Sequence, residues 1–271
     1  MSNFEPWQGY LVNSTGDYHY ICSPWKFAGA CVFGFDSDYT TMAIALVRYL
    51  TSNGHQITLS DIDEKVSKST LLAATEVTPD GSKLNLLCNT DASLTIASGK
   101  QPNPDSPIDV MRELDADIYN DISTAWLEEL NERNISQGAY ISGQQYGESL
   151  EARLSLVAQD HGSLIWPQRQ LDAAGNKIDQ IYKKIEPAGV ITSWTKLSAA
   201  GAPSEFALRA PILGGISTVM IQTTDGPNGV FLLVDDGSVE PIIGKSVELV
   251  VRRLYAQEGV MRYGLKALLA G

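Results

Sequence analysis

The sequence predicts an α+β protein with a mixed α/β amino-terminal domain and a carboxy-terminal β-barrel. Apolar residues recur at helical spacing in the first half, and the pattern changes to short strands with Gly-rich turns after Gly189. A Pro-rich break at residues 100–106 interrupts the first half. At 271 residues, the chain is long enough for two domains that each bury a core.

Composition excludes several classes of partner. The formal net charge of −12 argues against nucleic acid, because neutralising phosphates requires a dense basic surface. No run of eighteen apolar residues predicts a membrane helix, and Met1–Pro6 lacks the basic and apolar regions of a signal peptide. The three cysteines, odd in number and without framework spacing, fit free thiols in a reducing compartment. We therefore expect a cytoplasmic protein without a membrane partner.

The first half contains one clear helix and one expected hairpin. Asp36–Asp38 offers N-cap oxygens ahead of the periodic segment Tyr39–Leu50, and Gly54 stands where a glycine ends a helix. Further along, two apolar runs at residues 70–77 and 84–88 flank a Pro-Asp-Gly turn, which predicts a β-hairpin.

A second helix is expected from Pro107 to Arg133. Ser106 is a candidate N-cap, and proline is favoured at the first helical position. The rest of its surface is acidic, and a solvated helix face explains this better than a metal site, because no His or Cys joins the carboxylates. Its apolar stripe consists of Val110, Leu114, Ile118, Ile122, Trp126 and Leu130.

The carboxy-terminal third contains five short apolar segments separated by Gly-rich turns. Five strands with little helix predict a small closed barrel, for which the OB-fold is a common solution. The expected strands are residues 190–195, 215–224, 230–234, 247–255 and 260–266.

A motif precedes the barrel. It runs Ala158-x-x-His161-Gly162, then Trp166-Pro167-x-Arg169, then Asp172-x-x-Gly175, and a Gly189-Val190 strand follows. This order resembles the acyl-CoA-associated zinc-ribbon/OB-fold proteins, whose pattern is Cys-x-x-Cys-Gly, aromatic-Pro-Pro-Arg, Cys-x-x-Cys and a Gly-Val strand. The resemblance extends from Tyr146 to the end of the chain.

The four metal-ligand positions implied by the resemblance are Ala158, His161, Asp172 and Gly175. Structural zinc requires four side-chain donors in tetrahedral geometry, and two of these positions have none. We therefore expect a degenerate ribbon without zinc, held by the packing of Ile165, Trp166 and Ile178. The predicted domains are residues 1–137 (mixed α/β), 138–186 (a helical connector with the degenerate ribbon) and 187–271 (the OB-type barrel).

The resemblance implies a non-catalytic accessory subunit in a hetero-oligomer. Its partner would be a thiolase-fold catalytic subunit of a thiolase, an acyltransferase or a hydroxymethylglutaryl-CoA synthase-like enzyme, and this chain would help to shape the acyl-CoA channel. By motif position, Trp166 and Arg169 lie at the interface. Lys183 and Lys184 are nearby cations for CoA phosphates, although a solvated hairpin edge also explains them. No cofactor is expected to bind tightly, and a coenzyme A thioester would be held at the shared interface.

Two tryptophans allow a simpler interpretation than ligand binding. Trp166 fits core packing as well as a ligand contact, and Trp194, in the middle of a strand, is expected in the core.

The alternative is a fused acyl-CoA enzyme whose amino-terminal half is catalytic. Phe35–Ala43 resembles the DEDxxTMA segment of hydroxymethylglutaryl-CoA synthase-like enzymes, which draws attention to Asp36. Cys22 is the best candidate nucleophile and His19 the only nearby histidine, yet a buried, inert thiol also explains Cys22. Whether Cys22, Cys31 or Cys88 is reactive stays open. The chain has no G-x-S-x-G, H-E-x-x-H or Gly-rich phosphate-loop motif.

Overall fold

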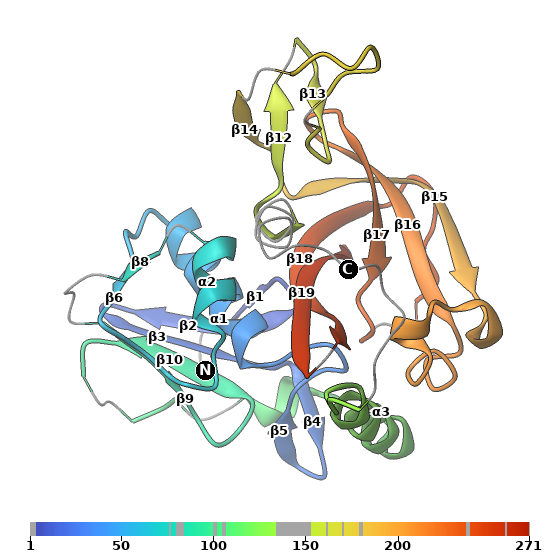
Figure 1. Cartoon of the computed structure of the whole chain (residues 1–271). Coiled ribbons are helices and arrows are strands. Elements are labelled where there is room, and N and C mark those ends of the chain that lie inside the picture. The colour runs from blue at the N-terminus through green and yellow to red at the C-terminus, as the bar shows by residue number, and fades with distance from the viewer. Residues whose placement is uncertain are drawn as a thin grey trace. The chain divides into compact units, whose positions relative to one another are not determined.

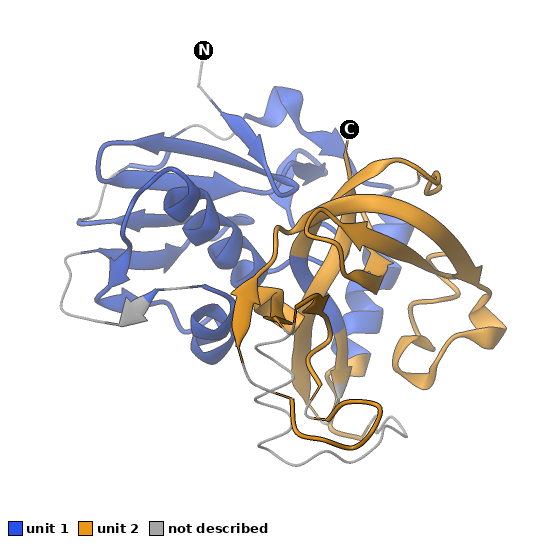
Figure 2. Cartoon of the chain, turned by 90° about the horizontal axis from the view of Figure 1, so that it is seen from above, with its two compact units in different colours: residues 1–128, 251–254 blue, residues 129–250, 255–271 orange. Residues whose placement is uncertain are grey.

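A computed structural model describes most of the chain. The described residues are 4–75, 77–79, 84–99, 102–104, 107–133, 153–160, 162–169, 171–178, 181–236, 239–257 and 259–270. The chain forms two compact units (Figures 1 and 2): unit 1 comprises Met1–Glu128 and Val251–Leu254, and unit 2 comprises Glu129–Val250 and Tyr255–Gly271. Mixed sheets with few helices and a closed barrel confirm the α+β class. None of the described helices is long and apolar enough to cross a membrane.

Unit 1 is built on a six-stranded sheet with the order β1-β2-β3-β10-β9-β7. Its strands are β1 (Glu5–Trp7), β2 (Tyr10–Thr15), β3 (Tyr18–Cys22), β7 (Asp61–Ile62), β9 (Asn85–Cys88) and β10 (Ser93–Ala97). A second sheet has the order β11 (Arg112–Glu113), β4 (Trp25–Phe27) and β5 (Ala30–Val32). Strands β6 (Thr58–Leu59) and β8 (Thr78–Pro79) form a parallel pair.

Helix α1 (Tyr39–Ser52) confirms the first predicted helix. Asp38 is its N-cap: the Asp38 carboxylate accepts the Thr41 N–H at 2.9 Å, and the Thr41 hydroxyl accepts the Asp38 N–H at 2.9 Å. Gly54 has a φ of +82° just beyond the C-cap, a conformation that favours glycine. The apolar positions of the helix are buried and contact β3 and β10, so α1 covers part of the large sheet.

Two predictions for unit 1 are wrong. Residues 70–74 belong to helix α2 (Lys68–Ala74) instead of a strand, because Leu71 and Ala74 are buried at helical spacing while α2 contacts α1. Strand β9 pairs with β10 and β7, so the expected hairpin does not form. The expected turn was Thr78–Ser82, of which residues 78 and 79 form strand β8, and residues 80–82 lie outside the described part of the chain.

The second predicted helix begins later than expected. Helix α3 spans Ala116–Glu129, after the 3-10 turn η1 (Ile108–Val110) and strand β11. The Asp115 carboxylate accepts the N–H groups of Asp117 and Ile118 at 3.1 Å each, so Asp115 caps the helix. Since β11 pairs with β4, the preceding residues are extended and Val110 is 70% exposed.

The carboxy-terminal half of unit 2 is a closed five-stranded barrel, as predicted. Its strands are β15 (Ala188–Leu197), β16 (Ile216–Thr223), β17 (Asn228–Leu233), β18 (Ser246–Gln257) and β19 (Val260–Leu269). They close in the order β15-β16-β17-β19-β18, and β17 and β19 pair in parallel. This is the strand order of an OB-type barrel. Alternate residues point inward, and Val219, Ile221 and Phe231 are buried there.

The segment that was predicted as a degenerate ribbon, called the ribbon segment below, precedes the barrel in unit 2. It forms a small sheet with the order β13 (Leu164–Ile165), β12 (Val157–Asp160) and β14 (Tyr182–Lys184). Residues 138–152, which belong to the expected helical connector, lie outside the described residues. The predicted limits of the three domains stay predictions.

Candidate functional site at the barrel mouth

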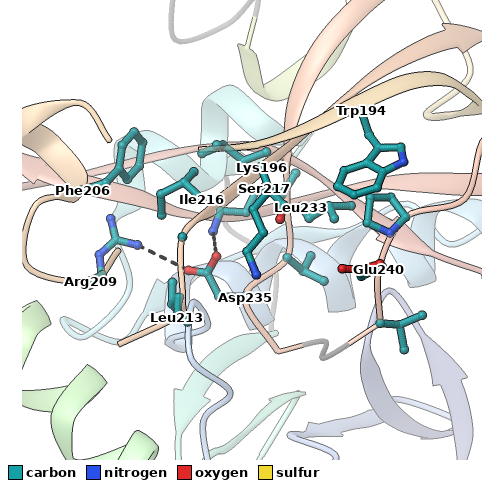
Figure 3. A pocket seen from close by; sticks show the side chains of 16 residues that line it. Trp194, Lys196, Phe206, Arg209, Leu213, Ile216, Ser217, Leu233, Asp235 and Glu240 are labelled. Atoms are coloured by element: carbon teal, nitrogen blue, oxygen red, sulfur yellow. Dashed lines mark hydrogen bonds and ion pairs between the residues drawn. The ribbon is translucent and has the colours of Figure 1, made fainter. Parts of the chain in front are cut away.

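A cavity of about 290 Å³ lies where strands β15, β16 and β17 meet the loop between β15 and β16. All of its lining residues belong to unit 2. Its walls include the side chains of Trp194, Lys196, Phe206, Leu213, Val239 and Glu240 (Figure 3). The lining is therefore polar and apolar in similar measure, with large apolar side chains beside several charged groups. Small-molecule sites also combine apolar walls with a few polar groups that orient the ligand.

Strand periodicity brings Trp194 and Lys196 to the same wall. They are two residues apart on β15, so they share a face, and Trp194 pairs with Val219 of the barrel interior. The prediction that Trp194 is a core residue is wrong: its side chain is 37% exposed, because this stretch of β15 lies at the rim of the cavity.

A glycine fixes the close approach of the β15–β16 loop to Lys196. Gly215 has a φ of +119°, and a Cβ built on it would lie 2.4 Å from the Leu197 carbonyl oxygen and 3.1 Å from Lys196 Cε. Glycine is therefore required at this position by both conformation and space. The loop backbone in turn supports the stem of the lysine side chain.

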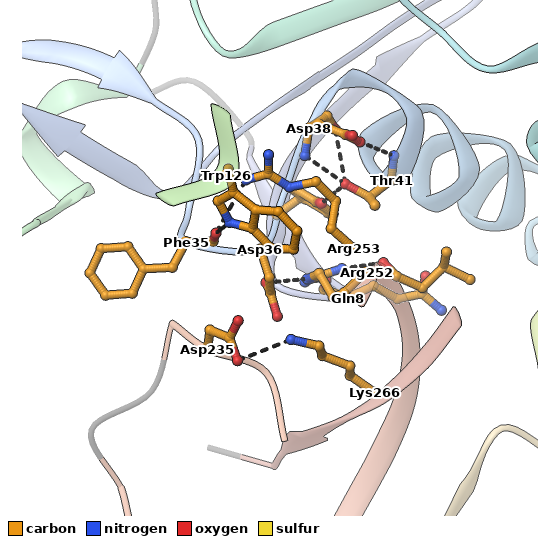
Figure 4. A network of polar contacts seen from close by, with 12 residues as sticks. Gln8, Phe35, Asp36, Asp38, Thr41, Trp126, Asp235, Arg252, Arg253 and Lys266 are labelled. Carbon is orange, nitrogen blue, oxygen red and sulfur yellow. Dashed lines mark hydrogen bonds and ion pairs between the residues drawn. The ribbon is translucent and has the colours of Figure 1, made fainter. Parts of the chain in front are cut away.

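Buried ion pairs form the polar floor of the cavity. Asp235 lies between two cations, with Oδ2 at 3.3 Å from Arg209 Nη1 and Oδ1 at 3.0 Å from Lys266 Nζ (Figures 3 and 4). Arg209 Nε also lies 2.7 Å from Glu129 Oε1, and the side chains of Arg209 and Lys266 are each 1% exposed. Desolvating these charges is costly, so the stability of the floor depends on every partner being present.

The charged residues that line this cavity were not predicted as site residues from the sequence. The signal for Lys196 was present, since an aromatic and a basic residue two apart on a strand share a face. The sequence gives no indication that three further charged residues are buried, because charged residues in loops and strands are usually solvated. These residues are Arg209, Asp235 and Lys266.

The four residues predicted at a CoA channel or partner interface do not converge on this cavity. Trp166 stacks on Phe231 with ring centroids 5.1 Å apart, and Arg169 is exposed. Lys183 lines a second cavity, of about 490 Å³, beside the β16–β17 turn. Lys184 is its neighbour on the exposed strand β14, so the two ammonium groups point to opposite faces. Their predicted interface role stays a prediction.

Three of the four positions that the resemblance implies as metal ligands are described, and His161 lies outside the described residues. Ala158 is fully buried on β12. The Asp172 carboxylate accepts N–H groups from Ala174 at 2.9 Å and Asn176 at 2.8 Å, and Gly175 completes the turn with a φ of +84°. Hydrogen bonds from the Asn176 side chain and from these backbone groups lower the pKa of Asp172. Hydrogen bonding therefore closes this turn, and the described part of the chain holds no cluster of three metal-type ligands.

The contact between ribbon and barrel depends on Gly229. A Cβ at this position would lie 2.6 Å from Trp166 Cζ3 and 2.6 Å from Phe231 Cε2, so a larger residue must separate the two stacked rings. We expect Gly229→Val to destabilise unit 2 by about 1–3 kcal/mol, as overpacking usually does. Urea unfolding followed by tryptophan fluorescence measures this. Gly201→Val is the control for glycine loss alone, since Gly201 is not in the left-handed region and a Cβ there would meet only Ser198 Oγ, at 3.7 Å. Equal losses in both variants would contradict the packing role.

The candidate nucleophile of unit 1 lies in the core. Cys22 and His19 are three residues apart on β3, so their side chains point to opposite faces of the sheet. Cys22 is fully buried in a cluster with Tyr20, Cys31 and Met111, and burial raises the pKa of its thiol far above the usual range. Burial also raises the pKa of Cys31 and of Cys88 to about 12 each. These thiols are protonated at neutral pH and therefore poor nucleophiles.

Asp36 belongs to a buried ion pair in unit 1. Its side chain is fully buried, and its Oδ1 lies 3.5 Å from Arg252 Nε (Figure 4). The Arg252 guanidinium also donates to the Gln8 carbonyl at 2.7 Å and lies 4.7 Å from the centre of the Tyr10 ring. The carboxylate thus compensates a buried cation.

His19 makes unit 1 sensitive to acid. Burial, followed by the charge of His55, lowers the pKa of His19, whose Nδ1 lies 2.7 Å from Ser14 Oγ. The folded state therefore binds fewer protons than the unfolded state, whose histidine titrates near ~6.5. Stability is fully present above that pH and is lost as the pH falls through it. We expect the free energy of unfolding to fall less between pH 7 and pH 5 in His19→Gln than in the wild type. Parallel curves from urea titrations would contradict this.

Comparisons with known proteins identify no family. No protein-family model and no curated protein matches the chain. Among solved structures, the chain is similar to one titled "Ltp2-ChsH2(DUF35) aldolase". The two are 17% identical with a TM-score of 0.34, over 48% of this chain and 98% of that chain. At this level, the similarity supports no argument about activity.

Proposed function

We propose that this chain is a non-catalytic accessory subunit of a thiolase-fold enzyme that acts on acyl-CoA, with the ribbon and barrel of unit 2 helping to shape the acyl-CoA channel. The observation that carries the proposal is the ribbon followed directly by an OB-type barrel, with Trp166 of the motif stacked on Phe231. This is the arrangement that the motif order implies.

The chemistry of unit 1 supports a non-catalytic role. Acyl transfer requires an activated nucleophile beside an oriented base. The described residues offer buried, protonated thiols, with His19 on the opposite face of β3 from Cys22. Asp36, which the alternative of a fused enzyme would use, is held by a buried arginine.

A turnover assay tests this part of the proposal. The purified chain is incubated with acetyl-CoA and acetoacetyl-CoA, and free thiol release is measured against a buffer blank. We expect no release above the blank, and no difference between the wild type and Cys22→Ser. Turnover that is lost in Cys22→Ser would overturn the proposal and move the chemistry into unit 1.

We also propose that the ribbon segment folds without zinc. Ala158 and Gly175 have no side-chain donor, and the Asp172 carboxylate is occupied by the hydrogen bonds of its own turn. We expect EDTA to leave the melting temperature unchanged within about 1 °C, since no metal contributes to folding. Mass spectrometry for elemental zinc is the direct measurement. One zinc per chain, together with a fall in melting temperature on chelation, would contradict the proposal.

A further inference from the structure

The cavity at the barrel mouth has the features of a ligand site that the accessory role does not require. Its rim leaves large apolar side chains uncovered, with Trp194 37% and Val239 64% exposed. A cavity of about 290 Å³ is close to the lower size limit of sites that hold small molecules. The floor of the cavity is polar, because Asp235 pairs there with Arg209 and with Lys266.

Of the described cationic side chains that line the cavity, two are held in ion pairs and one is available to bind a ligand. Arg209 and Lys266 are engaged by Asp235, and Arg209 also by Glu129. Among the described residues, the Lys196 ammonium has no hydrogen-bond or ion-pair partner, and the side chain is exposed. An anionic group of a ligand is therefore expected at Lys196, where a charge-assisted hydrogen bond can form.

The aromatic walls determine the shape of the ligand. The Trp194 side chain lies on the same face of β15 as Lys196, so one molecule can contact the indole and the ammonium together. Phe206 also lines the cavity (Figure 3). Its ring is held in place by Arg209, 5.4 Å from the ring centre, and by Tyr255, which packs edge-on with ring centres 6.2 Å apart. Planar rings gain most from such walls, since offset stacking adds to the buried area.

Glu240 determines the orientation of the ligand. It lines the cavity on the segment after β17, whereas Trp194 lines it on β15. Its carboxylate repels an anion and accepts hydrogen bonds. The anionic end of a ligand is thus directed to Lys196, and a hydrogen-bond donor is favoured near Glu240.

We propose that the barrel mouth binds a small planar aromatic carboxylate, with its carboxylate on Lys196, its ring against Trp194 and a hydroxyl donating to Glu240. Binding at this site does not depend on the accessory role, because the side chains of the cavity alone would hold the ligand. It also requires no catalytic step.

Isothermal titration of the full chain with 6-hydroxy-2-naphthoate tests the proposal. We expect a dissociation constant below about 1 mM for this probe. Binding should weaken roughly tenfold for 2-naphthol, which lacks the carboxylate, and roughly tenfold in Lys196→Met. It should also weaken in Trp194→Ala. The matched control is Lys177→Met, which removes an exposed lysine of the ribbon and should bind as the wild type does.

Absence of binding at millimolar probe, or equal affinity of the wild type, Lys196→Met and Trp194→Ala, would overturn the proposal. Thermal melting verifies that each variant is folded, and the surface variant Lys196→Met keeps the test valid should Trp194→Ala unfold. Equal affinity for the carboxylate and for 2-naphthol would likewise overturn the role of Lys196. None of these results bears on whether a partner subunit exists.

Discussion

Arg209→Met is expected to lower the stability of unit 2 by about 3–5 kcal/mol, the usual cost of removing one partner from a buried ion pair. The change leaves Glu129 buried without its ion pair and removes one of the two cations at Asp235. It also removes the cation that lies 5.4 Å from the ring centre of Phe206. At about 2–4 °C per kcal/mol, the melting temperature should fall by roughly 6–20 °C. Scanning calorimetry measures the shift.

The matched control is Arg133→Met, which removes an exposed arginine and should change stability by no more than about 0.5 kcal/mol. The double variant Glu129→Met with Arg209→Met removes both buried charges of the closest pair. We expect it to be more stable than the sum of the single variants predicts, since the residues are coupled. A loss below about 1 kcal/mol for Arg209→Met would show that the ion pairs do not hold the floor of the cavity.

Arg252→Met is expected to destabilise unit 1 by a similar amount, about 3–5 kcal/mol. The Arg252 side chain is 1% exposed, and its loss removes the cation that lies 3.5 Å from the buried Asp36 carboxylate and the donor of the Gln8 carbonyl. The contact with the Tyr10 ring at 4.7 Å is lost as well. Urea unfolding measures the change, with Arg112→Met on the exposed strand β11 as the control.

The same measurement tests whether Asp36 pairs with Arg252. We expect Asp36→Leu combined with Arg252→Met to recover part of the stability lost in Arg252→Met, because both charges of the buried pair are then removed. If the double variant lost as much stability as the two single variants added together, the pairing of Asp36 with Arg252 would be contradicted.

Local signals in the sequence predicted the elements that depend on local chemistry. Helix α1 has a reciprocal cap at Asp38 and Thr41, and the strands of the barrel alternate between Gly-rich turns. Such signals failed where pairing with distant residues decides the conformation. The segment before α3 is extended because β11 pairs with β4. In this pair Arg112 lies opposite Trp25, which is 87 residues earlier in the chain. Sequence spacing contains no information about that partner.

The candidate site was predicted less well than the fold, because its polar residues are buried charges. Lys266 lies on a barrel strand and Arg209 in a loop, and both positions suggest solvent exposure in a sequence. Lys266 is buried beside Asp235, which is 31 residues away in the sequence. Arg209 is buried beside Glu129, which is 80 residues away. These pairs become neighbours only in the fold. The motif around Trp166, in contrast, could be identified because its residues are close in sequence.

Native mass spectrometry of the untagged chain purified from its own cells tests whether this chain works as part of an acyl-CoA enzyme complex. We predict a hetero-oligomer in which peptide sequencing identifies the partner as a thiolase-fold subunit, with no zinc in the mass of this chain. A chain that is recovered alone at its sequence mass, and that does not associate with any thiolase-fold subunit on mixing, would contradict the prediction.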